Sequence, residues 1–199
     1  MPTGVAILDA RAQLFDAAER VLLRDGPSAL TSRAVTAEAS CAKGVLHRHF
    51  ADFDTFLAEF VLDRIARLDE QAAVLRLAAG TGTVAGNLSV ALTGLFESVA
   101  REILGLVTSR HELLERLRST TPTGIPVLVE ATAMVASYLR LEVELGRVAA
   151  EADVEALAPM LIGTGHLLFA GQQNASPEPP AVEKLVAGVI GGAVAGPQG

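Results

Sequence analysis

The sequence predicts an all-α protein, in which a small N-terminal group of three helices precedes a larger helical region. Apolar residues recur three and four positions apart along most of the 199 residues, and this is the period of an amphipathic helix. The alternation of apolar and polar residues that marks a half-buried strand is absent from any useful length of the chain. Half of the residues are hydrophobic but only 4% are aromatic, which favours helices that pack through Ala, Leu and Val.

The first helix is expected from about Arg11 to Asp25. Its apolar residues follow the i, i+1, i+4, i+7, i+8 spacing of a buried stripe. Gly26 and Pro27 then end it, since glycine favours a helix C-terminus and proline cannot continue one. The residues of the stripe are Leu14, Phe15, Ala18, Val21 and Leu22.

Residues 31–39 predict a short second helix. Thr31 is a good N-cap, because its hydroxyl can accept a hydrogen bond from a free backbone N–H of the first turn. Leu30 and Val35 stand at the two positions of a hydrophobic staple. Ser40 and Cys41 are expected to form the turn that follows.

A third short helix is expected up to Phe50, and it carries Lys43, His47, Arg48 and His49. Leu46 and Phe50 are four residues apart and share its inner face. Two short helices around a tight turn, the second one basic, form the layout of a helix-turn-helix DNA-binding motif. A solvated basic helix face is the alternative interpretation of these residues.

The segment closely resembles the TetR family of bacterial regulators. The family's pattern is roughly G-V-S-K-G-T-L-Y-H-Y-F, and residues 40–50 of this chain read S-C-A-K-G-V-L-H-R-H-F. The resemblance extends back through 14–26 and forward through 51–61, so it covers about the first third of the chain. It implies a homodimeric transcriptional regulator, expected to act as a repressor, whose DNA-binding domain spans 1–51 and whose effector-binding and dimerisation domain spans 52–199.

The resemblance also implies which residues contact double-stranded operator DNA. Thr31, Arg33 and His49 are expected mainly at phosphates, which position a protein without reading sequence. The helix that begins near Lys43 is expected at base edges, where Arg or Lys can pair with guanine. The full set of predicted contacts is Thr31, Ser32, Arg33, Lys43, Gly44, Val45, His47, Arg48 and His49.

Several residues depart from the family pattern. Ser40 replaces a glycine, Ala42 replaces a serine that can contact phosphate, and histidines at 47 and 49 replace tyrosines. Phe53 stands where a lysine is frequent. The net charge of −7 also argues against general attraction to nucleic acid. A helical ligand-binding or adaptor protein that no longer binds DNA therefore remains the alternative function.

The remainder of the chain predicts further helices, among them one near Asp69–Ala79 and one near Val84–Leu104, separated by Gly80-Thr81-Gly82. Two long helices, near 125–144 and 152–170, are apolar nearly all round and need cover on most sides. Family resemblance implies that this pair forms a four-helix interface with a second copy of the chain. A last helix is expected within 181–194.

A small apolar or amphipathic effector is expected to bind among the C-terminal helices. The candidates are polar or aromatic residues in apolar surroundings: Asn87, Thr93, Glu97, Arg101, His111, Tyr138 and His166. For each of them, a satisfied buried group or an ordinary surface residue is the alternative interpretation.

Catalysis, metal binding and cofactors are not expected. No Ser-His-Asp or paired-carboxylate spacing suggests an active site, although a small helical-bundle enzyme stays a distant alternative. His47 and His49 point about 200° apart on a helix and cannot share an ion. One cysteine, Cys41, excludes an intrachain disulfide. No secretory signal and no apolar run of about 18 residues is present, so a cytoplasmic protein without a membrane segment is expected.

Overall fold

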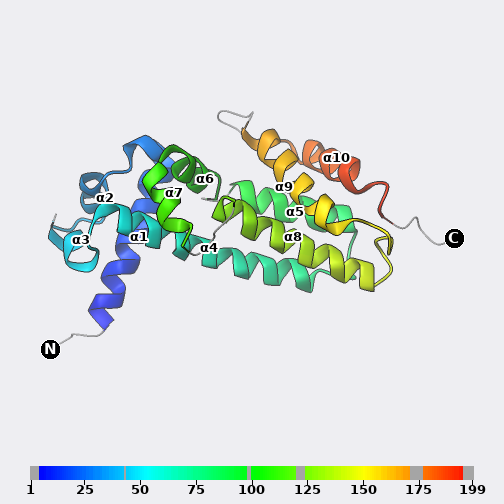
Figure 1. Cartoon of the computed structure of the whole chain (residues 1–199), viewed down its shortest axis with the longest axis horizontal. Helices are drawn as coiled ribbons and strands as arrows, with labels where there is room; N and C mark the ends of the chain where they lie inside the picture. The colour runs from blue at the N-terminus through cyan, green and yellow to red at the C-terminus, as the bar shows by residue number, and fades with distance from the viewer. Residues whose placement is uncertain (1–4, 43, 98–99, 120–123, 171–176, 195–199) are drawn as a thin grey trace. The chain divides into compact units, whose positions relative to one another are not determined.

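The computed structural model confirms the all-α fold. It describes residues 5–42, 44–97, 100–119, 124–170 and 177–194, and within these ranges there is no β-strand. The α-helices, labelled in Figure 1, are α1 (Val5–Asp25), α2 (Ser32–Glu38), α3 (Gly44–His49), α4 (Phe53–Leu77), α5 (Val84–Glu97), α6 (Ala100–Ser109), α7 (His111–Leu117), α8 (Pro126–Glu144), α9 (Val154–Ala170) and α10 (Pro179–Ile190). A short 3-10 helix, η1 (Pro27–Ala29), lies between α1 and α2.

The chain divides into two compact units. The first comprises residues 1–64 and 102–126, and the second comprises residues 65–101 and 127–199. The first unit therefore contains the whole of 1–51, for which the sequence predicts DNA binding, together with the beginning of α4 and with α7.

The core of the first unit grows from the predicted stripe of α1. All five of its residues are buried, and α1 packs against α2. Four phenylalanines extend this core, with the rings of Phe50 and Phe56 in an edge-on contact at 5.0 Å and Phe15 and Phe60 beside them. Such offset and edge-on pairs are favourable beyond the area that they bury. Four of the eight aromatic residues of the chain thus belong to this core.

Helix α4 is longer than the sequence predicts. A separate helix near Asp69–Ala79 was expected, but α4 runs without interruption from Phe53 to Leu77. No glycine or proline lies within this range, so nothing in its local chemistry ends the helix earlier. Within the expected helix near Val84–Leu104, the structure describes α5, which ends at Glu97, and α6, which begins at Ala100.

The second unit is a bundle in which α10 packs against α5 and α9, and α5 also packs against α9. The rings of Phe96 on α5 and Phe169 on α9 stack at 5.3 Å. Gly165 allows this close approach, because a Cβ atom at that position would lie 2.8 Å from the ring of Phe96. The two helices that the sequence predicts near 125–144 and 152–170 are present as α8 and α9.

None of the helices in the described ranges combines the length and the hydropathy that crossing a membrane requires.

Candidate nucleic-acid interface

Helix α2 begins as its sequence predicts. The Thr31 hydroxyl accepts a hydrogen bond from the Ala34 amide at 3.2 Å, which makes Thr31 the N-cap. Leu30 and Val35, the two staple residues, are both fully buried. Thr36 is buried as well, and its hydroxyl donates to the Ser32 carbonyl at 2.9 Å. These contacts fix the direction in which the chain enters the helix.

The turn between α2 and α3 requires a left-handed residue. Ser40 has a φ of 52°, and it is the one non-glycine residue with a positive φ in the described ranges. The Cys41 amide donates back to the Thr36 carbonyl at 3.0 Å, which closes the turn. A side chain at such a backbone conformation is unfavourable relative to glycine. Ser40, which stands where the family pattern has glycine, is thus a strained residue.

Helix α3 has one buried and one exposed face. Leu46 is fully buried, and Phe50 just beyond the helix is nearly so. His47 and Arg48 are exposed, and Gly44 at the start of the helix is exposed with open space where a Cβ would be. Because Arg48 has no hydrogen-bond or ion-pair partner among the described residues, its guanidinium is available to a ligand.

Arg11 of α1 contacts the C-terminal end of α3. Its guanidinium donates to the His49 carbonyl at 3.3 Å and lies 4.4 Å from the centre of the Phe50 ring. It also forms an ion pair with Glu59 of α4. One side chain thus ties α1, α3 and α4 together. Arg11 is not among the site residues predicted from the sequence, although it lies one helical turn before Phe15 on the buried side of α1.

Two arginines of α1 neutralise Glu38, the acidic residue of the motif. Glu38 accepts hydrogen bonds from Arg20 at 2.8 Å and from Arg24 at 2.9 Å. The hydrogen bond from Arg20 is the largest cause that lowers the pKa of Glu38, followed by that from Arg24. Glu38 therefore stays ionised and engaged with α1, while Arg33 and Arg48 remain exposed and unpaired within the described residues.

Two arginines, Arg110 at the N-cap of α7 and Arg116 within α7, contact the segments on either side of the motif in the first unit. The Arg110 side chain donates to the Leu30 carbonyl at 2.9 Å, directly before α2. Arg116 donates to Asp52 and Thr55, both at 3.1 Å, at the start of α4. Asp52 caps α4 by accepting from the Thr55 amide, and this hydrogen bond is the first cause that lowers the pKa of Asp52. Sequence spacing gives no signal for these contacts, because they join residues 61 to 80 positions apart.

Most of the predicted DNA-contact residues lie on α2, α3 and the residue that caps α2. Thr31, Arg33, Gly44, His47 and Arg48 are exposed. Ser32, Val45 and His49 are half-buried, and the Ser32 hydroxyl is a buried oxygen without a hydrogen-bond partner. Lys43 lies outside the described residues. The contact assignment itself stays a prediction.

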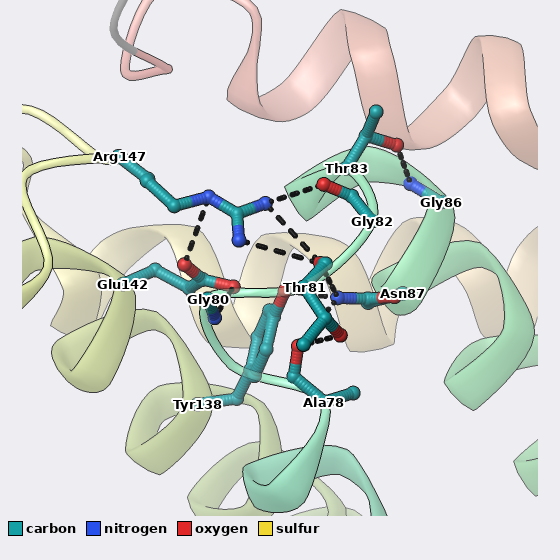
Figure 2. Close-up of polar contacts among 10 residues, drawn as sticks. All are labelled: Ala78, Gly80, Thr81, Gly82, Thr83, Gly86, Asn87, Tyr138, Glu142 and Arg147. Carbon is teal, nitrogen blue, oxygen red and sulfur yellow. Dashed lines mark hydrogen bonds and ion pairs between the residues drawn. The ribbon is translucent and has the colours of Figure 1, made fainter.

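Two of the predicted effector-site residues form a polar cluster in the second unit (Figure 2). The Asn87 amide donates to the Tyr138 hydroxyl at 3.0 Å and to the carbonyls of Ala78 and Thr81 at 3.0 and 2.9 Å. The fully buried Glu142 carboxylate belongs to the same cluster and accepts a hydrogen bond from the Gly80 amide at 3.4 Å. Burial, and then the nearby Glu142 carboxylate, raise the pKa of Tyr138, so the phenol keeps its proton.

Arg147 completes the cluster from the turn after α8. Its guanidinium donates to the Gly82 carbonyl at 2.9 Å and lies 3.4 Å from the Glu142 carboxylate (Figure 2). The cluster thus fastens the α4–α5 turn to the end of α8. Asn87 and Tyr138 satisfy each other, which supports the structural interpretation of these two residues. Glu142 and Arg147 were missed by sequence reasoning.

The other predicted effector-site residues do not join this cluster. Thr93 is half-buried and Glu97 exposed on α5, and Arg101 is half-buried on α6. His166 on α9 is half-buried, with its ring 6.2 Å from that of Phe96. His111 is exposed on α7, in the first unit, with its ring 3.9 Å from the Glu115 carboxylate.

Comparisons with known proteins agree with this geometry. A family model described as bacterial regulatory proteins of the tetR family matches residues 14–59. No curated protein matches the chain. Among solved structures, reduced NemR of E. coli has a TM-score of 0.74 at 15% identity, covering 96% of this chain and 100% of its own.

Two further solved structures have the same fold. A TetR-family transcriptional regulator from Mesorhizobium loti has a TM-score of 0.69 at 17% identity, covering 94% of this chain and 95% of its own. FadR from Bacillus subtilis, in complex with stearoyl-CoA, has a TM-score of 0.65 at 17% identity, covering 91% and 98%.

The helix-turn-helix geometry and these matches agree on one family. Members of that family are DNA-binding regulators and not enzymes, in accord with the prediction from the sequence. Residues 14–59 therefore match the TetR family of bacterial regulatory proteins, and the chain as a whole has the all-α fold of TetR-family regulators.

Proposed function

We propose that the protein is a ligand-responsive repressor that binds a palindromic operator as a homodimer and is released by a small-molecule effector. The observation that carries the proposal is the exposed face of α3, where Arg48 and His47 stand unpaired above a tightly packed core. Arg11, Arg110 and Arg116 hold the ends of the motif in place. A rigid, cationic short helix is suited to the major groove of DNA.

The exposed residues divide into two kinds of contact. We assign phosphate contacts to the exposed Thr31 and Arg33, at the start of α2, and base-edge contacts to the exposed Arg48 and His47. Few cations take part, so binding should depend on salt concentration with a shallow slope. Specificity would then come from the base contacts and from the spacing of two copies of α3.

The proposed dimer uses an exposed apolar stripe on α9. The stripe consists of Ala156, Met160, Gly163, Leu167 and Ala170, which share one helix face and are all exposed. Leu167 is 72% exposed, an unusual degree for a leucine within a helix. Neighbouring α10 adds the exposed small residues Ala187 and Gly188. A twofold pairing of these two helices with their copies would form a four-helix interface.

Helix α8 contributes less to this proposal than the sequence suggests. Its apolar residues, among them Val135, Tyr138 and Leu139, are buried within the second unit. Val129 is the one large apolar residue of α8 that is substantially exposed. The apolar surface of α8 is thus mostly covered by other residues of the same chain, whereas one apolar face of α9 is still exposed.

An effector would act through α4. This helix begins at Phe53 in the first unit and continues to Leu77 in the second, so it joins the DNA-binding motif to the C-terminal bundle. Binding of stearoyl-CoA by the FadR relative supports a small-molecule effector for this chain. A ligand that favours a conformation in which the two copies of α3 are wrongly spaced for the major grooves would weaken DNA binding. DNA would weaken ligand binding by the same factor.

Fluorescence polarisation with a labelled duplex from the region upstream of the protein's own gene tests the proposal. We expect saturable binding that a scrambled duplex of equal composition does not compete away. Equal affinity for both duplexes, or no binding at low salt, would favour a helical ligand-binding or adaptor protein that no longer binds DNA.

A further inference from the structure

An open groove of about 420 Å³ lies between α4 and α5, entirely within the second unit. Its walls are apolar, with Val74 and Ala78 on the α4 side and Val90, Ala91 and Gly94 on α5. A volume of this size suits one small organic molecule.

The apolar walls of the groove are exposed to solvent. Val74 is 69% exposed and Val90 is 75% exposed, although both are large aliphatic residues on long helices. Gly94 adds open space, because a Cβ built there would meet no atom within 4 Å. An apolar ligand seated here would remove this surface from water, which is favourable roughly in proportion to the area covered.

Two polar side chains of the groove have an acceptor oxygen without a hydrogen-bond partner among the described residues. The Gln71 side-chain oxygen is buried and has no hydrogen-bond partner. The Glu70 carboxylate at the rim is exposed and has no partner among the described residues. The amide nitrogen of Asn87, the third polar residue of the lining, already has hydrogen-bond partners in Ala78, Thr81 and Tyr138. No lysine or arginine lines the groove.

We propose that this groove binds the effector, and that the effector is an apolar molecule with an amine or another hydrogen-bond donor at one end. The donor would meet the Glu70 carboxylate when cationic and, after a rotation of the Gln71 side chain, the Gln71 oxygen, while the apolar body lies between Val74 and Val90. A buried unpartnered acceptor is unfavourable, so satisfying Gln71 adds to the affinity. The role in regulation rests on the function proposed above, whereas the binding does not.

The same lining disfavours an anionic ligand. A carboxylate or phosphate placed in the groove would lie beside Glu70 and the Gln71 oxygen without a basic side chain to balance it. The class of effector we infer for this chain is therefore the opposite in charge to an acyl-CoA. A second copy of the chain is a weaker candidate occupant, because the continuous apolar stripe of α9 is the better surface for dimerisation.

Three probes with one apolar body and different ends test the charge preference: 4-phenylbutylamine, 4-phenylbutanol and 4-phenylbutyrate. Isothermal titration calorimetry on the full chain, without DNA, should rank the amine first, the alcohol second and the carboxylate last. We expect the amine to bind at least about tenfold more tightly than the carboxylate, because one charge-assisted hydrogen bond is worth that factor. Equal affinities, tighter binding of the carboxylate, or no detectable binding of any probe would overturn the proposal.

Three variants test the location. Gly94→Leu should fill the groove and abolish amine binding, while the open space at this position leaves the melting temperature unchanged or raised. Glu70→Gln should weaken the amine but not the alcohol. Asp69→Asn makes a similar change one residue away, outside this groove, and should have no effect.

Unaltered amine binding in Gly94→Leu would place the site elsewhere and overturn the proposal. Conversion of this variant to a monomer, measured by light scattering, would show a protein interface in the groove and would overturn it as well. Polarisation with operator DNA, recorded separately for each variant, distinguishes these outcomes from a failure of DNA binding itself.

Discussion

Arg48 is the residue whose removal should most weaken DNA binding. Its guanidinium is exposed on α3 and has no partner within the described part of the chain. A good contact to a base is worth about 1–3 kcal/mol. Arg48→Ala should therefore reduce operator affinity by about tenfold to a hundredfold in a polarisation titration.

Arg76→Ala is the matched control for Arg48, because Arg76 is also an exposed arginine but lies on α4 in the second unit. Its operator affinity should equal that of the unaltered chain. Equal affinities of the Arg48→Ala and Arg76→Ala variants would remove Arg48 from the proposed interface.

Ser40 offers a test of stored backbone strain. Its φ of 52° is a conformation that glycine adopts without strain and other residues adopt at a cost. Ser40→Gly should raise the free energy of unfolding by about 1 kcal/mol in urea denaturation. Ser40→Ala, which keeps the Cβ, should give no such gain, and a gain as large as that of glycine would show that the backbone is not the cause.

At the scale of elements, the start of α4 should be sensitive to acid. The pKa of Asp52 is lowered by hydrogen bonds from Thr55 and by Arg116, so the folded state favours the ionised carboxylate. The stability from Asp52 is therefore complete above the unfolded pKa of about 3.9 and is lost as the pH falls through the lower folded value. Asp52→Asn should lose this contribution at neutral pH.

The measurement is the urea midpoint as a function of pH from neutral to about 3, since the unfolded pKa is about 3.9. The midpoint of the Asp52→Asn variant should fall less over this range than that of the unaltered chain. Glu144→Gln, at an exposed position on α8, serves as the control. Parallel curves for the Asp52→Asn variant and the unaltered chain would contradict the assigned role of the cap.

The polar cluster behind the α4–α5 turn should be structural. Tyr138→Phe removes the hydroxyl that accepts a hydrogen bond from Asn87, while Asn87 keeps its two carbonyl partners. We expect a loss of about 1–2 kcal/mol in the free energy of unfolding. Amine binding in the groove should persist, and its disappearance in a stable variant would instead make Tyr138 part of the ligand site.

Local chemistry predicts some elements better than others. The α1 stripe, the Thr31 cap and the staple of Leu30 and Val35 depend on neighbouring residues, so the sequence predicts them correctly. The predicted length of α4 was wrong, because a helix can continue through any stretch in which no residue ends it. The Arg110 and Arg116 contacts depend on how α6 and α7 fold back, which periodicity does not reveal.

The candidate sites show the same contrast between local and distant information. Exposure of His47 and Arg48 follows from their register against Leu46 and Phe50 on α3. The partnership of Asn87 with Tyr138 joins residues 51 positions apart, and sequence reasoning could only name both as polar residues in apolar surroundings.

At the scale of the whole molecule, the proposed dimer should depend on the stripe of α9. Leu167→Glu would place a carboxylate at the centre of an apolar interface, where an unpaired charge is strongly unfavourable. Light scattering should show a monomer, and operator binding should weaken, because one reading helix alone loses the avidity of two. A dimeric Leu167→Glu variant would place the interface on another surface.

The central claim is that two copies of α3, paired by a twofold axis, read successive major grooves of DNA. Selection of bound duplexes from a random pool by the full-length protein, followed by sequencing, tests this claim most directly. We predict enrichment of an inverted repeat whose half-sites are centred about one helical turn, 10–10.5 base pairs, apart or at a multiple of it. A pool without enrichment, or one enriched in a single unrepeated half-site, would contradict it.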